Sequence, residues 1–557
     1  MLIARLQRER DETEPPMRDG GADGLHGLPA ELAEALIESR WADALSCSDR
    51  LMTLGPPNAR LWFIRGVLLR LASRMDEAIE AYQRSIALGY AGPGPYTELF
   101  QHLEKRGRID EALACWQLAS ARGYSTKRFH SMALDARLKR PGATGDELMQ
   151  AHVAWAARYG RPDPGVPALR IDPFDGSRPL RVGYVCSFWE APTIRSMLLP
   201  VLKRHDPRRV QAYLYLSAPL RAGETWRELY EPHAAAVREV DRLTDREFLD
   251  LTRADLIDVL IDLNGHSGGH RYSAMASRCA PVQAVYLNYT STTAVPNMDY
   301  VIGDRWSPPL GTEATFTEQV ERLDGCFFNF DFSDAALLPP VSPAPVTHNG
   351  YVTFGCFGSG TKINAPLVEW WSRILKRVPD ARLFIRNLEL SPLDNRRALE
   401  RQFAGHGIDT DRLRLAGKGT RRDILRSYAD VDIALDTYPY CGGNTTAEAL
   451  WQGVPVVTLA GPRFSASYGA SLLNGAGCPE LVARTHDEYI DLAVALAQAP
   501  DELVAYRAYL RSMVVEHGLG NADTFTPQFE DSLIRMRMRA GHERNPPRPP
   551  AAECLPS

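Results

Sequence analysis

The chain has 557 residues, of which 45% are hydrophobic and 24% are charged. This composition is typical of globular proteins and excludes a collagen-like, a wholly disordered or a disulfide-scaffold protein. A chain of this length predicts about three or four domains. The formal net charge of −5 gives no electrostatic reason to expect a nucleic acid or an anionic membrane as partner.

The nine cysteines include no C-x-x-C pair, which indicates neither a disulfide framework nor a zinc ribbon and favours a reducing compartment. Residues 1–24 lack the apolar segment of a signal peptide, and no apolar stretch approaches the length of a membrane span. We therefore expect a cytoplasmic protein without a membrane span. Residues 1–25 are predicted to be a disordered N-terminus, and residues 541–557 a flexible, proline-rich tail.

Residues 40–125 repeat with a period of 34 residues. The recurring pairs are Trp62 and Tyr96, Tyr82 and Trp116, Gly89 and Gly123, and Tyr90 and Tyr124. This period is that of tetratricopeptide repeats, in which each repeat is a pair of helices that must stack on its neighbours. We predict helical repeats over residues 26–140. Their surface either holds a polypeptide or only supports the next domain, and the sequence leaves both interpretations open.

After a connector at residues 141–179, short apolar runs alternate with helical patterns. The predicted strands are residues 180–188, 210–217, 256–264, 282–289 and 300–304 and, after a proline-rich hinge at 338–345, residues 351–357, 382–386, 413–415, 431–435 and 454–459. Helices are predicted between them, among others at 365–378 and 446–452. Nearly continuous hydrophobicity is typical of strands buried on both faces of a parallel sheet. The sequence predicts two doubly wound α/β domains, residues 180–345 and 346–540, with ligands at the carboxyl ends of their strands.

A glycine-rich turn leads from an apolar run into a helix at residues 431–451, VDIALDTYPYCGGNTTAEALW. Residues 442–443 let the backbone approach a ligand, and the N–H groups at the start of a helix favour a phosphate. Thr445 and Thr446 add hydroxyl donors, and Glu448, in the predicted first turn, can accept hydrogen bonds from a ribose. The alternative is that Asn444 or Thr445 only caps the helix.

A second glycine-rich segment, residues 354–362, reads FGCFGSGTK. A Walker A loop requires a lysine directly after its last glycine, whereas Thr361 separates Gly360 from Lys362, so the spacing excludes this type of NTPase. A lysine at the end of a strand can still neutralise the charge that develops on a leaving diphosphate, without a metal ion. The alternative is an ordinary solvated loop lysine.

Residues 265–269 read GHSGG and match the G-x-S-x-G elbow of serine hydrolases. No HGGG-like oxyanion segment precedes them, and the hydrolase interpretation leaves the second α/β half without a purpose. His266 and His270 have the spacing of zinc-binding histidines, but no H-E-x-x-H motif or companion carboxylate accompanies them. We predict no metal site and keep a serine hydrolase that uses Ser267 as an alternative.

Four long segments follow one another behind the repeats: VLIDLNGHSGG, APVQAVYLNYTSTTAVPNMDYVIGD, FGCFGSGTKI and VDIALDTYPYCGGNTTAEALWQGVPVVTL. In this order they resemble the O-linked N-acetylglucosamine transferase family, which includes the SPINDLY-type proteins. The resemblance covers most of residues 40–515. It implies two Rossmann-like domains of the GT-B type and an inverting transfer of N-acetylglucosamine from UDP-GlcNAc to Ser or Thr hydroxyls of proteins. UDP would be the product, and neither a cofactor nor a metal ion is implied.

By motif position, the resemblance also implies roles for single residues. Lys362 resembles the lysine at the donor diphosphate, Glu448 resembles the acidic residue that holds the ribose, and Arg421 lies near the position that contacts uracil. The implied donor-binding residues are Lys362, Gly443, Asn444, Thr445, Thr446, Glu448 and Arg421.

The implied catalytic residues are Lys362, Asn264 and His266, of which the last two lie in a loop that resembles the one lining the reaction centre. One position departs from the family pattern, because Ala191-Pro192 stands where the family has a His-Pro pair. Alanine exchanges no proton, so the base is His266, Asp262, water or the donor phosphate. The alternative is a repeat-bearing scaffold that binds UDP and has lost the transfer activity.

Overall fold

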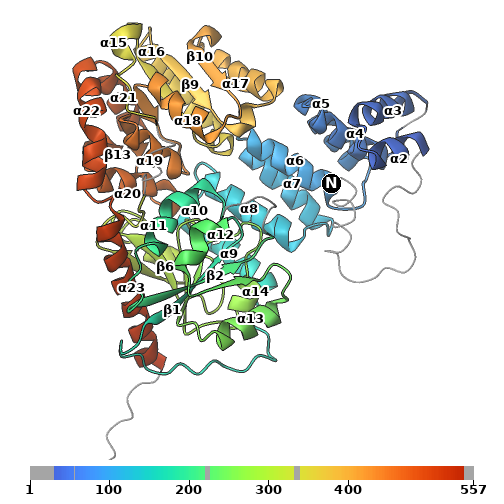
Figure 1. Cartoon of the computed structure of the whole chain (residues 1–557). Helices are drawn as coiled ribbons and strands as arrows, with labels where there is room; N and C mark the ends of the chain where they lie inside the picture. Colours follow the sequence, from blue (N-terminus) through green and yellow to red (C-terminus); the bar gives the residue numbers. More distant parts are fainter. Residues whose placement is uncertain (1–29, 55–56, 220–225, 331–338, 545–557) are drawn as a thin grey trace, which may run out of the picture. The chain divides into compact units, whose positions relative to one another are not determined.

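The structure is a computed structural model that describes residues 30–54, 57–219, 226–330 and 339–544. The chain folds as two compact units, and Figure 1 labels many of their elements. The first unit comprises the described residues up to Pro141 together with Gly355–Ile424. The second comprises Gly142–Phe354 together with the described residues from Leu425 onward. The first unit thus combines the helical repeats with part of the second predicted α/β domain.

The repeats of the first unit are pairs of helices joined by short turns. Their bounds are α2 (Ala30–Ile37), α3 (Trp41–Leu54), α4 (Ala59–Leu71), α5 (Met75–Ala87), α6 (Gly94–Lys105), α7 (Ile109–Ala121) and α8 (Lys127–Lys139). A Cβ added to Gly66 in α4 would lie 2.5 Å from the ring of Tyr82 in α5, so the two helices of this pair need a glycine there to approach each other. The 34-residue period is therefore a repeat of helix pairs, as the sequence predicts.

Buried aromatic rings join successive helix pairs into one core. Phe63 of α4 contacts Tyr82 and Tyr90, and Phe100 of α6 contacts Phe129 of α8 with an edge-to-face geometry. Because each pair buries its apolar side only against the next pair, the repeats are stable as a stack and not singly.

The α/β part of the first unit lies at Gly355–Ile424. Its elements are the 3₁₀ turns η3 (Gly360–Lys362) and η4 (Leu388–Leu390), the helices α16 (Ala365–Arg377) and α17 (Leu393–Gly405), the strands β9 (Arg382–Arg386) and β10 (Leu413–Ala416), and the start of α18 (Arg421–Ser427). The predicted helix at 365–378 matches α16 because Asn364 caps it: its side chain accepts a hydrogen bond from the N–H of Leu367 at 3.1 Å.

The second unit contains a parallel sheet of seven strands in the order β3-β2-β1-β4-β5-β6-β7. The strands are β1 (Leu180–Cys186), β2 (Val210–Leu216), β3 (Ala236–Glu239), β4 (Val259–Asp262), β5 (Val282–Val285), β6 (Tyr300–Asp304) and β7 (Gln319–Leu323). All neighbouring pairs are parallel. The strand order reverses between β1 and β4, and at such a point an open α/β sheet forms its ligand site.

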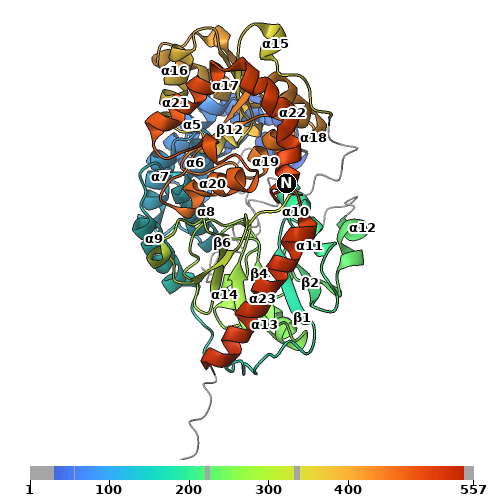
Figure 2. The same cartoon turned by 90° about the vertical axis from the view of Figure 1, so that its left-hand side faces the viewer.

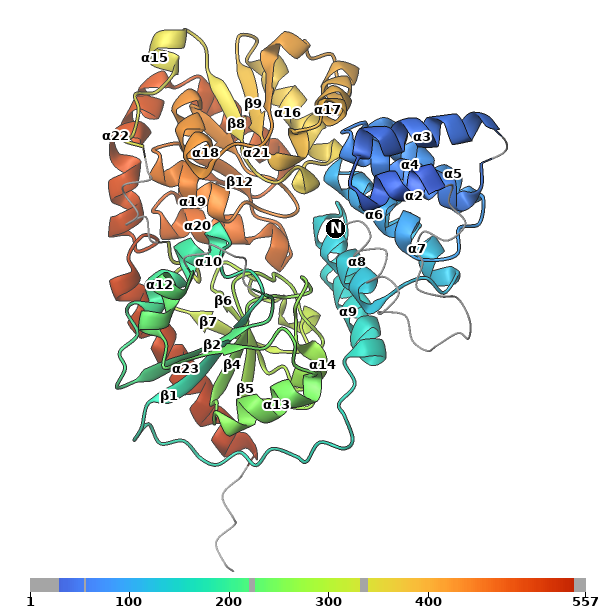
Figure 3. The same cartoon turned by 45° about the vertical axis from the view of Figure 1, so that its right-hand side comes forward.

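Helices cover both faces of this sheet. Figure 2 shows α23 (Ala522–Arg544) along one face, and Figure 3 shows α13 (Asp245–Ala254) and α14 (Tyr272–Met275) on the other. Glu530 anchors α23, because its carboxylate accepts from the N–H of Asp206 at 2.9 Å and lies 3.0 Å from His205. Residues 541–544 of the predicted flexible tail therefore belong to a helix, whereas residues 1–25 and 545–557 lie outside the described residues.

A second sheet has six strands in the order β10-β9-β8-β11-β12-β13, so that its order reverses between β8 and β11. The remaining strands are β8 (Thr353–Cys356), β11 (Ile433–Leu435), β12 (Val456–Leu459) and β13 (Val482–Ala483). The remaining helices are α9 (Gly145–Tyr159), α10 (Pro192–Met197), α11 (Leu199–Leu202), α12 (Trp226–Tyr230), α15 (Val346–Asn349), α19 (Asn444–Trp451), α20 (Tyr468–Gly475), α21 (His486–Ala497) and α22 (Pro500–Glu516). Helical repeats and two Rossmann-like domains therefore make up the fold, as the sequence predicts.

Two predictions need correction. The connector predicted at 141–179 contains the helix α9, which begins with a capping box between Thr144 and Glu147. The strand predicted at 256–264 begins only at Val259, because Leu256 has a φ of 54° and turns the chain away from an extended path. Within the residues that the structure describes, no helix is both long and apolar enough to cross a membrane.

Candidate functional site

The loop after β4 is shaped by Asp262, the last residue of that strand. Its carboxylate is fully buried and accepts hydrogen bonds from the N–H of Gly265 and the hydroxyl of Tyr272, both at 2.8 Å. Burial raises the pKa of Asp262 to about 6, because the charged form loses hydration, and these hydrogen bonds offset only part of that loss. Asp262 thus fixes the loop from beneath and is poorly placed to act as the base.

His266 lies in a cage of rings at the tip of this loop. Only 3% of its surface is exposed, and its ring centroid lies 4.6 Å from that of Trp155 and 5.2 Å from that of Tyr289. Gly265 makes this packing possible: its φ is 61°, and a Cβ there would lie 2.4 Å from Tyr289. The structure therefore holds His266 in a fixed place inside the loop, and its role as base or positioner stays a prediction.

The cage includes a residue that sequence reasoning missed. His152, on α9, lies with its ring centroid 5.3 Å from that of His266. Its Nδ1–H donates to the carbonyl of Leu148 at 2.6 Å, so its Nε2 accepts from the hydroxyl of Tyr289. The capping box of α9 was the available signal for this helix, but nothing in the sequence indicates that it packs on a loop more than a hundred residues away.

Asn264 connects this loop to the end of β1. Its side chain is fully buried, and its Oδ1 accepts from the N–H of Ser187 at 2.7 Å. The hydroxyl of Ser187 donates in turn to the carbonyl of Gly268 at 2.6 Å. In this structure Asn264 positions the backbone, and its predicted catalytic role stays a prediction.

The segment that begins at Ser187 also reaches the glycine-rich turn. Ser196, near the end of α10, hydrogen-bonds through its hydroxyl to Oδ1 of Asn444 at 2.8 Å. Ala191 lies between these two anchor points and precedes α10, with extended backbone angles. The position that departs from the family pattern therefore belongs to the segment that joins the two predicted site loops of the second unit.

The N-terminus of α19 is the strongest candidate for an anion site. The N-cap residue is Gly443, and no side chain caps the helix. A Cβ on Gly443 would meet no atom closer than 3.8 Å, so the backbone there has room beside it. The prediction that Asn444 or Thr445 only caps the helix is therefore wrong, and the first N–H groups of α19 keep their capacity to bind a phosphate.

The polar residues of α19 differ in their exposure. Asn444 and Thr445 are half-buried, whereas Thr446 and Glu448 are buried. The amide of Asn444 donates to the carboxylate of Glu448, one turn further along the helix. Because α19 begins at Asn444, Glu448 lies beyond the first turn in which the sequence placed it. Its predicted contact with a ribose stays a prediction.

Asp436, which sequence reasoning also missed, organises this turn from the end of β11. Its carboxylate accepts from the N–H of Gly442 at 2.6 Å, from the N–H of Thr437 at 2.8 Å and from the hydroxyl of Thr458 at 2.6 Å. The side chain is almost completely buried. An aspartate at the end of an apolar strand was the available signal, although the predicted strand ended at 435.

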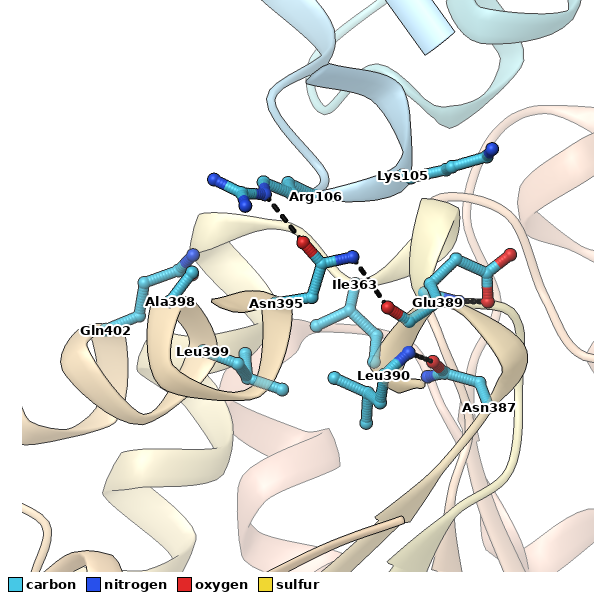
Figure 4. Close-up of a pocket in the computed structure, with 11 residues that line it drawn as sticks. Lys105, Arg106, Ile363, Asn387, Glu389, Leu390, Asn395, Ala398, Leu399 and Gln402 are labelled. Atoms are coloured by element: carbon cyan, nitrogen blue, oxygen red, sulfur yellow. Dashed lines mark hydrogen bonds between the residues drawn. The ribbon is translucent and has the colours of Figure 1, made fainter. Parts of the chain in front are cut away.

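The segment that carries Lys362 belongs to the first unit and has its own carboxylate. Glu389 of η4 accepts from the N–H of Gly360 at 3.1 Å and from the hydroxyl of Ser359 at 3.2 Å. Figure 4 shows Glu389 beside Asn387 in this part of the unit. Lys362 is the last residue of η3 and is half-buried. The structure thus places Lys362 on a hydrogen-bonded turn, and its predicted role at a diphosphate stays a prediction.

Arg421 is the first residue of α18, after the end of β10. The helix starts there because Thr420 and Asp423 form reciprocal hydrogen bonds at 3.0 and 3.2 Å. Arg421 and Lys362 thus lie in the first unit, whereas Asn264, His266 and the residues of α19 lie in the second.

The hydrolase alternative lacks its structural context. A nucleophile elbow places its serine on a sharp turn between a strand and a helix. Here β4 ends at Asp262 and α14 begins only at Tyr272, so Ser267 lies in the middle of a long loop. Among the described residues, no group of three His, Cys, Asp or Glu side chains is arranged to hold a metal ion.

Comparison with known proteins identifies the family. Residues 172–338 and 347–529, more than half of the chain, match glycosyl transferase family 41. The chain belongs to this family. It is 30% identical over 394 residues to the probable UDP-N-acetylglucosamine–peptide N-acetylglucosaminyltransferase SPINDLY of Arabidopsis thaliana, which covers 70% of this chain. The protein of the same name from Solanum lycopersicum is 31% identical over 403 residues and covers 71%.

A solved structure of a Thermobaculum terrenum O-GlcNAc transferase mutant is similar over most of the chain. Its TM-score is 0.79 at 30% identity, and the match covers 92% of this chain and 97% of that one. By contrast, the chain spans only 43% and 42% of the lengths of the Arabidopsis and Solanum relatives. The similarity confirms the arrangement of helical repeats followed by two Rossmann-like domains.

Proposed function

We propose that this family 41 protein is an inverting glycosyltransferase that moves N-acetylglucosamine from UDP-GlcNAc to Ser or Thr hydroxyls of proteins. The observation that carries the proposal is the uncapped N-terminus of α19 behind Gly443, in a chain whose relatives are named for this transfer. The hydroxyl of the acceptor attacks the anomeric carbon, the bond to the donor phosphate breaks, and UDP leaves.

The departing UDP carries the charge that the site must stabilise. In our proposal the N–H groups of residues 444–446 and the ammonium group of Lys362 share that charge, since preorganised donors stabilise a developing anion better than water does. In support, Lys362 and this turn each follow the carboxyl end of a strand, β8 and β11 respectively. Thr445 and Thr446 add hydroxyls, Glu448 holds the ribose and Arg421 lies near the uracil.

The acceptor side is the loop after β4. His266 acts as base or positions the acceptor hydroxyl, and the rigid cage around it keeps the imidazole in one orientation. The acceptor is a polypeptide, which the stacked repeats help to hold. We propose a cytoplasmic location, in which the buried thiols of the described cysteines stay reduced.

Substitution of Lys362 tests the proposed chemistry. Lys362→Ala should lower the rate of UDP release from UDP-GlcNAc by about 100-fold, because one charged donor to the leaving group is lost. The measurement is steady-state turnover with an acceptor protein mixture, and transfer is followed with a labelled sugar. Turnover close to that of the natural chain would contradict the role of Lys362.

A UDP-binding scaffold without transfer activity remains the second candidate, because Ala191 stands where the family has a histidine. The two candidates differ in turnover and not in UDP affinity. A scaffold binds UDP in calorimetry but transfers no sugar, and Ala191→His would then be the variant that gains activity. A transferase turns over UDP-GlcNAc with Ala191 in place.

A further inference from the structure

The turn between the repeat helices α6 and α7 contacts the backbone directly after Lys362. Gly107 in this turn has a φ of 69°, and a Cβ there would lie only 1.8 Å from the carbonyl oxygen of Ile363. Ile363 is the residue directly after Lys362 and is itself buried. Both sides of this contact belong to the first unit. The repeat thus supports the C-terminal side of the lysine.

The glycine is required by this approach and not by the turn. In the preceding repeat, the position 34 residues earlier is Ser73, which adopts a φ of 60° with its side chain in place. Gly123, at the end of the next helix, has a φ of 77°, and a Cβ there would meet nothing within 4 Å. The left-handed turn alone therefore tolerates a side chain, whereas the contact with Ile363 does not.

A chain of hydrogen bonds supports the other side of the lysine. The guanidinium of Arg106 donates to Oδ1 of Asn395 at 2.8 Å, and the amide of Asn395 donates to the carbonyl of Glu389 at 2.7 Å. The carboxylate of Glu389 then accepts from the N–H of Gly360 at 3.1 Å. Figure 4 shows Arg106, Asn395 and Glu389 in line, joined by the first two of these hydrogen bonds.

The contact between the α6–α7 turn and the segment formed by η3, η4 and α17 is closely packed. The side chain of Arg106 is only 9% exposed, and the cavity between the repeat and α17 measures about 30 Å³. A water molecule needs roughly 10–15 Å³ of such space, so the cavity takes two or three waters and no larger ligand. This region is therefore a packing contact and not a binding pocket for a ligand.

We propose that the α6–α7 turn is a positioning element for Lys362, acting through Gly107 on one side and through the Arg106–Asn395–Glu389 chain on the other. This inference rests on the proposed function of Lys362 at the diphosphate. Positioning matters there, because a displacement of about 1 Å at a reacting group can cost about 100-fold in rate. The repeats thus help to build the donor site, in addition to any contact with the acceptor.

The test measures how much the diphosphate adds to binding, as the ratio of the affinities for UDP and for uridine in calorimetry. Lys362→Ala should lower this ratio, because uridine lacks the groups that the lysine contacts. Gly107→Ala should lower it by about ten-fold, whereas the matched control Gly123→Ala should change it by less than about two-fold, since only the former displaces Ile363.

A double-mutant cycle separates positioning from general destabilisation. In the Lys362→Ala background, Gly107→Ala should lower the ratio by less than about two-fold, because the group it positions is already gone. Equal effects in both backgrounds would overturn the inference. If Lys362→Ala alone left the ratio unchanged, the proposed role of Lys362 would fail instead, which is a different outcome.

Asn395→Ala provides a second variant should Gly107→Ala not fold. It removes the middle of the hydrogen-bond chain and should lower the UDP/uridine ratio by about three- to ten-fold, since two hydrogen bonds are lost. Its control is Arg397→Ala on the same helix, whose side chain is exposed. A similar ratio for both variants would overturn the inference.

Discussion

Asp262 and Asp436 hold corresponding places in the second unit, and the loops that they organise differ in one respect. Each aspartate lies at the carboxyl end of a strand, is buried, and accepts hydrogen bonds from the N–H groups of the loop that follows. After β4 the loop is filled by aromatic rings around His266, and only 3% of the surface of His266 is exposed. After β11 the turn ends at a helix that no side chain caps.

The difference shows that a buried aspartate at a strand end can support either a closed, ring-filled loop or a turn with accessible N–H groups. A buried carboxylate at a strand end makes a polar loop rigid, because it satisfies N–H groups that would otherwise lose their hydration. After β4 the loop then holds His266 among the rings of Trp155, Tyr289 and His152. After β11 it leaves the first backbone N–H groups of α19 available for an anion. Predictions that affect one loop and not the other therefore test the account.

The largest effect is expected for Asp436→Ala. The N–H groups of Thr437 and Gly442 and the hydroxyl of Thr458 would lose their acceptor, which should lower the free energy of unfolding by about 3–5 kcal/mol. The distorted turn should bind UDP about 100-fold more weakly. Chemical unfolding and calorimetry measure the two effects.

The counterpart Asp262→Ala should also destabilise the protein but should leave UDP affinity within about three-fold, since our proposal places the diphosphate at the start of α19 and not at the loop after β4. Equal losses of UDP affinity in Asp262→Ala and Asp436→Ala would break the distinction between the two loops.

A pH-dependent effect follows from the raised pKa of Asp262. In the folded protein the carboxyl group of Asp262 stays protonated up to a pH of about 6, whereas in the unfolded chain it loses its proton at lower pH. The raised pKa therefore adds to the free energy of unfolding, and this contribution is complete below the pKa that Asp262 has in the unfolded chain. This contribution to stability is lost as the pH rises through 6. Asp262→Asn removes this dependence. The difference in unfolding free energy between the two proteins should change by about 3 kcal/mol over this range.

Chemical unfolding at pH values from about 4 to about 7 measures this difference. A difference that stays constant with pH would show that Asp262 does not bind a proton in this range. The account of a carboxyl group held under the acceptor loop would then need revision.

A smaller effect is expected for Ser196→Ala. The hydroxyl that meets Asn444 would be lost, and one neutral hydrogen bond of about 1 kcal/mol corresponds to roughly a five-fold loss of UDP affinity. Ser187→Ala is the matched control, because its hydroxyl binds the carbonyl of Gly268 in the other loop. The link between the segment and the donor turn is refuted if both serine variants bind UDP alike.

The sequence predicted the inner strands well and missed three of the four strands that lie at the edges of the described sheets. The predictions for β6 and β9 match the observed strands, because each contains a buried apolar run, VI in β6 and LFI in β9. The strands β3, β7 and β13 were missed, and all three lie at the edges of their sheets, whereas the fourth edge strand, β10, was predicted at 413–415. Polar residues hide the apolar pattern in QVERL of β7 and AVRE of β3. The strand β13 has only two residues, too few to form a pattern.

The sequence predicted the motifs of the candidate site but not the long-range contacts that hold these motifs in place. The glycine-rich turn and the lysine could be recognised because their spacing is local. The contacts of His152 with Tyr289, of Ser196 with Asn444 and of Gly107 with Ile363 join residues that are distant in the sequence. No local pattern encodes such contacts, since they depend on how the elements pack.

The most direct test of the central claim is a crystal structure of the protein with UDP. The account predicts that oxygens of the diphosphate lie roughly 3 Å from the backbone N–H groups of residues 444–446. Density for the diphosphate away from the start of α19, with these N–H groups bound only to water, would contradict it.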